Sequence, residues 1–247
     1  MSKYSECISV VLVEPQSPGN IGMVCRAMKN MGLSRLRLVG GCDRFHPDSL
    51  KFAVAARDLL EKAEIFSDLP SALADCTLTA GTTRRHGKYR QEILAPQQIA
   101  DVFRAQVRPD CTAAIVFGRE DSGLTTDELA LCRWHATIPA AEEYGSLNLS
   151  QAVLIFCYEL CRDPETAQDS RKFPLATSGE MESMFGQMDT CLQKIGFLNE
   201  QNPAHVMRSL RRIFFRAELD SRDVAILRGM LTQIDWASSG FDGRKRA

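Results

Sequence analysis

Short apolar runs rich in β-branched residues alternate with helical patterns over the first 162 residues of the chain. Parallel strands need long crossover connections, usually helices, and strands covered on both faces read as nearly continuous apolar runs. The alternation therefore predicts an α/β fold, with a parallel sheet and helices on both of its faces. The expected strands are residues 8–13, 35–39, 64–66, 77–81, 113–118 and 134–139, and the expected helices lie near residues 20–31, 49–62, 68–75, 96–106, 125–131 and 148–162.

The pattern changes after Arg162. Residues 163–180 are polar, contain two prolines and show no periodicity of apolar residues, which is typical of a linker. Three helical patterns follow, near residues 179–195, 203–218 and 221–237. The expected organisation is an α/β domain, a linker and a small all-α C-terminal extension, with bounds of 1–163, 164–178 and 179–247.

Composition excludes several classes of protein. The 247 residues carry a formal net charge of -1, so a polyanionic partner would have to be met by a local basic patch. Nine cysteines without a C-x-x-C pair and four scattered histidines argue against a metal site, and we expect reduced thiols in a cytosolic protein. The N-terminal apolar run is too short for a signal peptide, and no apolar stretch is long enough to span a bilayer. A soluble, cytoplasmic protein is expected.

Ligands of open α/β sheets bind at the loops that follow the carboxyl ends of the strands. Four such loops stand out: "EPQSPGN", "AGTTRRHGKYR", "FGREDSGL" and "IPAAEEYGSLNLSQA". The chain has no dinucleotide-binding G-x-G-x-x-G after its first strand, no P-loop and no G-x-S-x-G nucleophile elbow. The remaining possibility is a set of glycine-bearing loops that could hold a small cofactor through backbone contacts, beside a basic loop.

The first expected helix carries an arginine, Arg26, among apolar residues. Helical periodicity places Arg26 on the same side as Gly22 and Lys29, away from the core side. We therefore expect Arg26 to project from a polar face into a cleft at the strand ends. The residues expected on the core side are Ile21, Val24, Met28 and Met31.

Three segments, "PGNIGMVCRAMKNMGL", "FGREDSGL" and "GSLNLSQAVLIFCYEL", resemble the three motifs of the SPOUT (SpoU/TrmH-type) RNA ribose 2'-O-methyltransferases. They occur in the family's order over roughly residues 5–162, each at an expected strand end. The helical C-terminus is similar to that of the members that methylate cytidine or uridine in tRNA. The resemblance implies a deep trefoil knot at the C-terminal end of the α/β domain, S-adenosylmethionine as cofactor, and a homodimer with active sites at the subunit interface. It also implies tRNA as substrate, methylated at the first nucleotide of the anticodon loop.

The resemblance also implies roles for individual residues. Those that match the family's catalytic positions are Arg26, Asn20, Glu120, Ser146 and Asn148. Those that match its cofactor-binding positions are Ala80, Gly81, Thr82, Gly118, Glu120, Ile138, Gly145, Ser146 and Leu147. Asn20, Ser146 and Asn148 are also residue types that cap helices, and the two roles are compatible. Glu120 could equally be an ordinary acidic residue of its loop.

Basic residues suggest where RNA would bind. Arg26 is the candidate for the phosphate next to the target ribose, because its planar fork matches a phosphate group. Its side chain stays protonated in proteins, so we expect it to position the phosphate and stabilise the developing alkoxide rather than act as the base. The other candidates are Arg84, Arg85, Lys88 and Arg90 in the second loop, and Arg208, Arg211 and Arg212 in the C-terminal extension. Instead of binding RNA, the basic residues of the loop could belong to an ordinary solvated surface. The arginines of the extension could form ion pairs with Glu218 and Asp220.

Two other functions compete with ribose methylation. One is a base methyltransferase on the same scaffold, against which the asparagine–arginine pair and "SLNLSQA" argue. The other is a non-catalytic RNA-binding module, which would keep the basic residues without needing cofactor loops. The helix over 148–162 is apolar on nearly all sides, so we also expect part of it to be buried against a second subunit.

Overall fold

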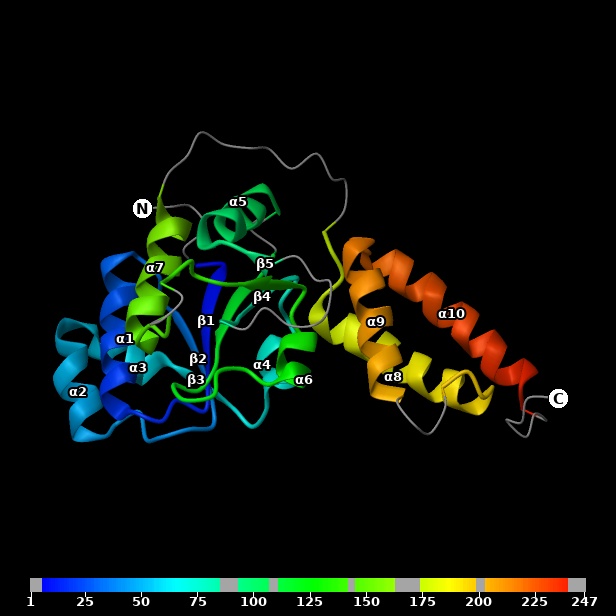
Figure 1. Cartoon of the computed structure of the whole chain (residues 1–247), viewed down its shortest axis with the longest axis horizontal. Coiled ribbons are helices and arrows are strands. Elements are labelled where there is room, and N and C mark those ends of the chain that lie inside the picture. The colour runs from blue at the N-terminus through cyan, green and yellow to red at the C-terminus, as the bar shows by residue number, and fades with distance from the viewer. Residues whose placement is uncertain are drawn as a thin grey trace. The chain divides into compact units, whose positions relative to one another are not determined.

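The computed structural model describes residues 6–84, 93–106, 111–141, 145–162, 174–198 and 203–239. Arg85, Lys88 and Arg90 of the predicted RNA-binding loop lie outside these ranges. The chain divides into two compact units, Met1–Ser170 and Arg171–Ala247 (Figure 1).

The first unit is built on a seven-stranded sheet with the order β3-β2-β1-β6-β4-β7-β5. Every pairing in it is parallel. The parallel sheet expected from the alternation of strands and helices is therefore confirmed. The strands are β1 (Ile8–Val13), β2 (Arg35–Val39), β3 (Glu64–Phe66), β4 (Leu78–Thr82), β5 (Ile93–Leu94), β6 (Ala113–Phe117) and β7 (Trp134–Ala136).

Helices cover both faces of this sheet, as the sequence predicts. Helices α1 and α7 lie on one face and α4 and α6 on the other (Figure 1). Helix α7 packs against both α1 and α5, and α2 packs on the outside of α1. The bounds are α1 (Pro18–Asn30), α2 (Pro47–Ala53), a 3-10 helix η1 (Val54–Ala56), α3 (Arg57–Lys62), α4 (Leu69–Leu73), α5 (Pro96–Gln106), α6 (Thr126–Ala130) and α7 (Leu149–Cys161).

The central strands are apolar throughout because both of their faces are covered. All six residues of β1 are buried. On one face, Val11 and Val13 pack in a cluster with Leu69 and Leu73 of α4. On the other, Phe117 of β6 meets Phe156 of α7 edge to face, with ring centroids 5.5 Å apart. These contacts fix the position of α7 over the carboxyl end of β6.

Three local features differ from the sequence prediction. The helix expected over 49–62 is divided into α2, η1 and α3, because Val54 adopts a positive φ of 50°. The two-residue strand β5 was not predicted. The strand expected over 134–139 ends at Ala136, so that residues 137–139 belong to the loop that follows.

Gly22 was predicted to share the polar side of the first helix, and this prediction is wrong. A Cβ added to Gly22 would lie 2.3 Å from the carbonyl oxygen of Ser49 and 2.8 Å from the amide nitrogen of Ala53. The side of α1 that carries Gly22 is therefore packed tightly against α2. Met31 was expected in the core and is only half-buried, whereas Ile21, Val24 and Met28 are fully buried.

In its described residues, the second unit contains three helices, α8 (Ser178–Lys194), α9 (Pro203–Arg216) and α10 (Ser221–Ala237). Phe185 of α8 forms its centre, with edge-to-face contacts to Phe214 and Phe215 of α9. Helices α8 and α10 each begin with a capping box, formed by Thr177 with Glu180 and by Asp220 with Asp223. The unit therefore has defined helix starts and a hydrophobic core of its own.

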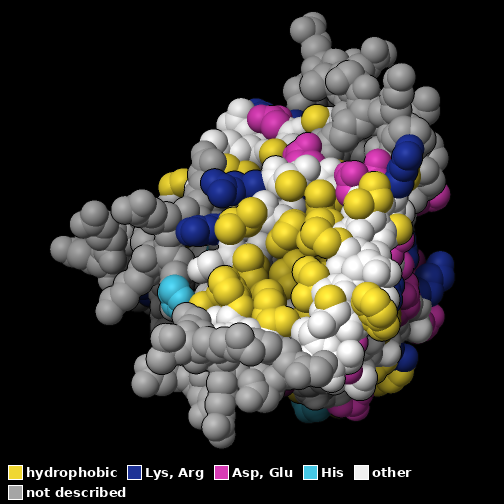
Figure 2. All heavy atoms as spheres, turned by 90° about the vertical axis from the view of Figure 1, so that its right-hand side faces the viewer, with side chains coloured by type: hydrophobic (Ala, Val, Ile, Leu, Met, Phe, Trp, Pro, Cys, Tyr) yellow, Lys and Arg dark blue, Asp and Glu magenta, His cyan; other side chains and the backbone are white. Residues whose placement is uncertain are grey.

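The surface of the second unit carries several exposed apolar side chains. Figure 2 shows hydrophobic side chains gathered in the middle of the face turned to the viewer. Exposed large apolar side chains of the unit are Phe197, Ile213, Ile226, Met230 and Trp236. Such an area of exposed apolar side chains is typical of an interaction surface.

Among the arginines of α9, Arg211 is engaged within the unit. Its guanidinium forms a two-bond ion pair with Glu182 and lies 4.5 Å from the ring centroid of Phe185. The ion-pair partner of Arg211 is therefore Glu182, a residue that the sequence analysis did not consider. Asp220 caps α10 instead.

All nine cysteines are reduced, and six of them are buried. The residues that the structure describes include no helix long and apolar enough to cross a membrane.

Candidate active site

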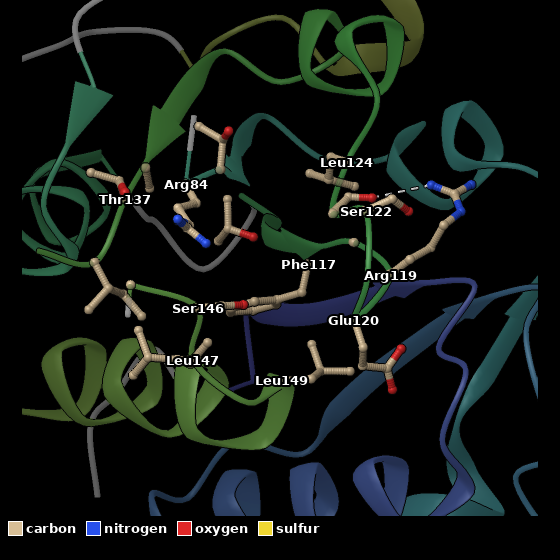
Figure 3. Close-up of a pocket in the computed structure, with 18 of the residues that line it drawn as sticks. Arg84, Phe117, Arg119, Glu120, Ser122, Leu124, Thr137, Ser146, Leu147 and Leu149 are labelled. Carbon is tan, nitrogen blue, oxygen red and sulfur yellow. Dashed lines mark hydrogen bonds between the residues drawn. The ribbon is translucent and has the colours of Figure 1, made fainter. Parts of the chain in front are cut away.

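A pocket of about 560 Å³ opens at the carboxyl ends of β4, β6 and β7 (Figure 3). This is the edge of the sheet where ligands of α/β proteins bind. The floor contains Phe117, Leu149 and Phe156, while hydroxyl groups and charged side chains lie around it. Of the predicted cofactor-binding residues, those that line the pocket are Thr82, Gly118, Glu120, Ile138, Gly145, Ser146 and Leu147.

The loop that follows β6 folds back on itself directly beside the pocket. A Cβ on Gly118 would lie 2.1 Å from the carbonyl carbon of Gly123 and 2.3 Å from the amide nitrogen of Leu124. Any larger residue at position 118 would therefore collide with the backbone of the returning segment. Arg119 holds the loop in place through ion pairs with Glu14, at 2.8 Å, and Glu128, at 3.0 Å.

Glu120 connects this loop to the start of α1. Its carboxylate accepts hydrogen bonds from the backbone N–H groups of Gln16 and Ser17, at 2.8 and 3.0 Å, and from the side-chain amide of Asn20, at 2.8 Å. Burial alone would raise the pKa of Glu120, but these donated bonds outweigh it and hold the pKa below its ordinary value. Glu120 is therefore ionised at neutral pH, and its oxygens are occupied as acceptors.

A second set of hydrogen bonds joins α1 to the start of α7. The oxygen of the Asn20 side chain accepts a hydrogen bond from the Asn148 amide, at 2.9 Å. The Asn148 oxygen in turn accepts bonds from the backbone N–H and the hydroxyl of Ser150, and Asn148 thereby caps α7. Glu120, Asn20 and Asn148 thus form one chain of hydrogen bonds that links all three motif segments. Capping and cross-linking are combined in Asn148.

Ala80 and Gly81 were also expected to contact the cofactor, but neither lines this pocket. Ala80 is fully buried within β4. A Cβ on Gly81 would lie 2.9 Å from the sulfur of Cys132 and 3.0 Å from Leu129, so this glycine allows the end of α6 to pack against β4. Thr82, the next residue, does reach the pocket while its hydroxyl donates to the carbonyl of Val116.

Two ranges of the chain match the models of known protein families. Residues 7–158 match the SpoU rRNA Methylase family. The chain belongs to the SpoU methylase family. Residues 179–244 match the C-terminal domain of the tRNA methyltransferase TrmJ. Both matches confirm the resemblance carried by the three motifs and the helical extension.

Relatives of this SpoU methylase align over nearly its full length. A tRNA (cytidine/uridine-2'-O-)-methyltransferase TrmJ from Sodalis glossinidius is 38% identical over 235 residues, covering 92% of this chain and 91% of the relative. A tRNA (cytidine/uridine/adenosine-2'-O-)-methyltransferase TrmJ from Pseudomonas aeruginosa is 36% identical over 250 residues, covering 96% and 97%. The crystal structure of TrmJ from Z. mobilis ZM4 is similar in fold, with a TM-score of 0.82 and 33% identity over 92% of this chain and 98% of that one.

Arg26 does not line the pocket of this SpoU methylase chain. It is exposed on α1, and within the described residues it forms no hydrogen bond or ion pair. It lies one turn beyond Met23, whose sulfur is 3.9 Å from the Ser150 hydroxyl at the start of α7. Arg26 therefore faces outward on α1, near α7. It does not project into the pocket at the strand ends of its own chain, where the sequence analysis expected it.

Arg84 does line the pocket, although the sequence suggested only an RNA contact for it. The pocket also includes Phe117, Leu149 and Phe156, which sequence reasoning did not assign to the site. Apolar residues of this kind also form the hydrophobic core, so the sequence does not distinguish a pocket-lining residue from a core residue. The position of Phe117 near the carboxyl end of the expected strand 113–118 was the one available hint.

Proposed function

We propose that this SpoU methylase transfers a methyl group from S-adenosylmethionine to the ribose 2'-oxygen of a cytidine or uridine at the first nucleotide of the tRNA anticodon loop. The observation that carries the proposal is that the second and third motif segments line one pocket and are joined to the first motif by the hydrogen bonds of Asn20 with Glu120 and Asn148. The named relatives, which match over more than nine tenths of this chain, support the same chemistry.

The pocket fits the cofactor that the family resemblance implies. Its volume lies within the range of small-molecule sites, about 300–1,000 Å³. Phe117, Leu149 and Phe156 offer an apolar surface to a purine ring, and Gly145 keeps the facing loop free of a side chain. The residues that would hold the cofactor are Thr82, Gly118, Ile138, Gly145, Ser146 and Leu147. When bound, S-adenosylmethionine supplies a methyl group attached to a positively charged sulfur.

The protein's own contribution is to orient the ribose hydroxyl, a poor nucleophile at neutral pH. Ser146 lines the pocket, and its hydroxyl would accept a hydrogen bond from the 2'-hydroxyl of the substrate. Arg26 would hold the adjacent phosphate with its fork and stabilise the negative charge that develops on the 2'-oxygen as its proton passes to a water molecule and the methyl group moves from sulfur to oxygen. Alignment of this kind supplies a large part of the acceleration in reactions between two bound groups. Glu120 and Asn20 act as positioning residues, because their polar groups are committed to the protein itself.

The position of Arg26 supports a site made by two chains. Within one chain it lies outside the pocket, and on α7 nearby the apolar side chains of Leu154 and Tyr158 are 38% and 52% exposed. We propose that a homodimer forms through this surface, so that Arg26 of one chain serves the pocket of its partner. Apolar burial on α7 would supply the association free energy.

The helical second unit is proposed to bind tRNA. Arg208 and Arg212 lie on α9 with Arg211, whose guanidinium is already engaged by Glu182. A positive surface of this kind binds phosphates with an affinity that falls steeply with salt. We propose Arg208, Arg211 and Arg212 as the residues of α9 that make ionic contacts to tRNA. The nine reduced cysteines support action in the cytoplasm.

Transfer of a labelled methyl group tests the proposal. The protein is incubated with methyl-labelled S-adenosylmethionine and bulk unmodified tRNA, and the RNA is then digested to nucleosides. We expect label in 2'-O-methylcytidine or 2'-O-methyluridine. Because one relative's name includes adenosine, labelled 2'-O-methyladenosine would extend the substrate range. Label on a base, or none in RNA, would contradict the proposal.

A further inference from the structure

Arg84 is an unusual member of the pocket because its charge has no partner in the described part of the chain. Within the described part of the chain, four charged side chains line the pocket: Arg84, Arg119, Glu120 and Asp121. Arg119 is paired with two glutamates, and Glu120 accepts three hydrogen bonds. The Asp121 carboxylate accepts a bond from the Ser122 hydroxyl at 2.8 Å. Among the described residues of the pocket, Arg84 is thus the cation available to an incoming anion.

The side chain of Arg84 lies over the loop that starts the third motif. Its Nε is 3.5 Å from the position that a Cβ on Gly145 would occupy. In Figure 3 the guanidinium projects from the end of β4 into the space between Thr137 and Phe117, above Ser146. A ligand lying against Phe117 would therefore present its far end to Arg84. A Cβ at position 145 would be in ordinary van der Waals contact with Arg84, whereas its tight contact, at 2.9 Å, would be with the carbonyl oxygen of Ala141.

We propose that Arg84 binds the carboxylate of the cofactor's amino-acid part. This assignment rests on the proposed function, in which the pocket holds S-adenosylmethionine. That molecule has a single anionic group, its carboxylate, and a guanidinium fork matches a carboxylate with two parallel hydrogen bonds. Arg84 then selects an adenosyl ligand that carries an intact amino-acid group over one that lacks it.

A tRNA phosphate is the competing ligand for Arg84. The geometry favours the carboxylate, because Arg84 shares the pocket with Gly145, Ser146 and Leu147, the loop proposed to hold the cofactor. Arg26, by contrast, lies outside the pocket and is exposed on α1. In this assignment Arg84 binds the carboxylate of the cofactor, and Arg26 binds a phosphate of the RNA.

Calorimetry with two matched ligands tests the assignment without any turnover. The full chain is titrated with S-adenosylhomocysteine and with its decarboxylated analogue, which keeps the adenosine, the thioether and the amine. Arg84→Gln should weaken binding of S-adenosylhomocysteine by about ten- to a hundredfold, since a hydrogen bond to a charged group is lost. The same variant should bind the decarboxylated analogue as the wild type does. Arg84→Lys should lose less, because the charge remains and only the fork is lost.

Arg57→Gln is the matched control, because Arg57 is an exposed arginine at the start of α3 and does not line the pocket. It should bind both ligands as the wild type does. The assignment is overturned if Arg84→Gln weakens both ligands equally or neither. It is also overturned if Arg84→Gln reduces only tRNA binding, measured by filter retention without cofactor. If the wild type binds neither ligand, the proposed function itself fails, and the assignment fails with it.

Discussion

At the scale of single residues, the site depends on polar side chains that are hydrogen-bonded to one another within the protein. Asn20 is 6% exposed and uses its amide to bind Glu120 and its oxygen to accept from Asn148. A buried polar group left without a partner costs about 1–3 kcal/mol, so each member of this chain depends on the others. The sequence could assign these residues to the motifs, but it could not say that they bind each other.

The charge of Glu120 gives a stability that depends on pH. Its folded pKa lies below the ordinary value because Asn20, Gln16 and Ser17 donate to its carboxylate despite the opposing effect of burial. This contribution is complete above the unfolded pKa, about 4.3, and is lost as the pH falls through the lower folded pKa. Glu120→Gln should therefore be less stable than the wild type at neutral pH, with the gap narrowing in acid. Urea unfolding at a series of pH values measures this gap, and a gap that stays constant would contradict the account.

The proposed role of Arg26 depends on the geometry of its fork as well as its charge. Arg26→Lys should lower turnover by about ten- to a hundredfold, because one charge-assisted bond is worth roughly 1.5–3 kcal/mol. Its unfolding midpoint should not change, since Arg26 is exposed. Lys29→Arg on the same helix, where Lys29 pairs with Asp58, is the control and should keep full activity. Turnover near the wild-type value in Arg26→Lys would argue against the fork.

At the scale of elements, close packing of α1 on α2 sets where the first motif lies. Gly22 allows the helices to approach until backbone atoms of Ser49 and Ala53 fill the place of a side chain. The motif glycine thus has a packing role that helical periodicity alone did not reveal. Helical periodicity alone assigns Gly22 to the same side of the helix as the exposed Arg26.

Two glycine substitutions separate packing from helix propensity. Gly22→Ala should destabilise the protein by about 1–3 kcal/mol, because the new methyl group overlaps backbone that cannot move aside. Gly186→Ala is the matched control in α8, where nothing lies within 4 Å of the added Cβ. It should be neutral or stabilise by about 0.5–1 kcal/mol. Denaturant unfolding compares the two, and equal effects would contradict the packing argument.

Much of this fold could be predicted from the sequence, because strands buried on both faces give clear apolar runs. The failures have physical causes. Strand β5, which pairs with β7, has only two residues, and two residues are too few to show an apolar pattern. The break at Val54 needs a positive φ in a β-branched residue, and no residue type signals that. For the site, three motifs predicted the loops, whereas the partner of each polar atom depends on tertiary geometry.

At the scale of the whole molecule, the proposed active site needs residues from two chains. The pocket belongs to one chain, and Arg26 lies outside it on the surface that also carries Leu154 and Tyr158. A symmetric dimer brings the same surface patch of each chain together, so two equivalent shared sites would result. No single-chain sequence pattern could locate a residue that acts in a partner. The expected trefoil knot likewise stays a prediction from the resemblance.

Mixing two inactive variants tests the shared site. Arg26→Ala and Ser146→Ala are co-expressed with different tags, and the mixed dimer is isolated. One of its two sites then carries both defects and the other carries none, so about half of the wild-type rate per dimer should return. Dimers of each variant alone should stay nearly inactive. A mixed dimer with no recovered activity would place Arg26 in its own chain's site.

The central claim, transfer to a ribose oxygen at one tRNA position, is tested most directly by alkaline hydrolysis. Alkaline cleavage of RNA needs a free 2'-hydroxyl, so a methylated ribose leaves one gap in the ladder of fragments. End-labelled tRNA treated with the protein and S-adenosylmethionine should show a single gap at the first nucleotide of the anticodon loop, absent without the cofactor. An uninterrupted ladder from tRNA that has taken up methyl groups would contradict the account.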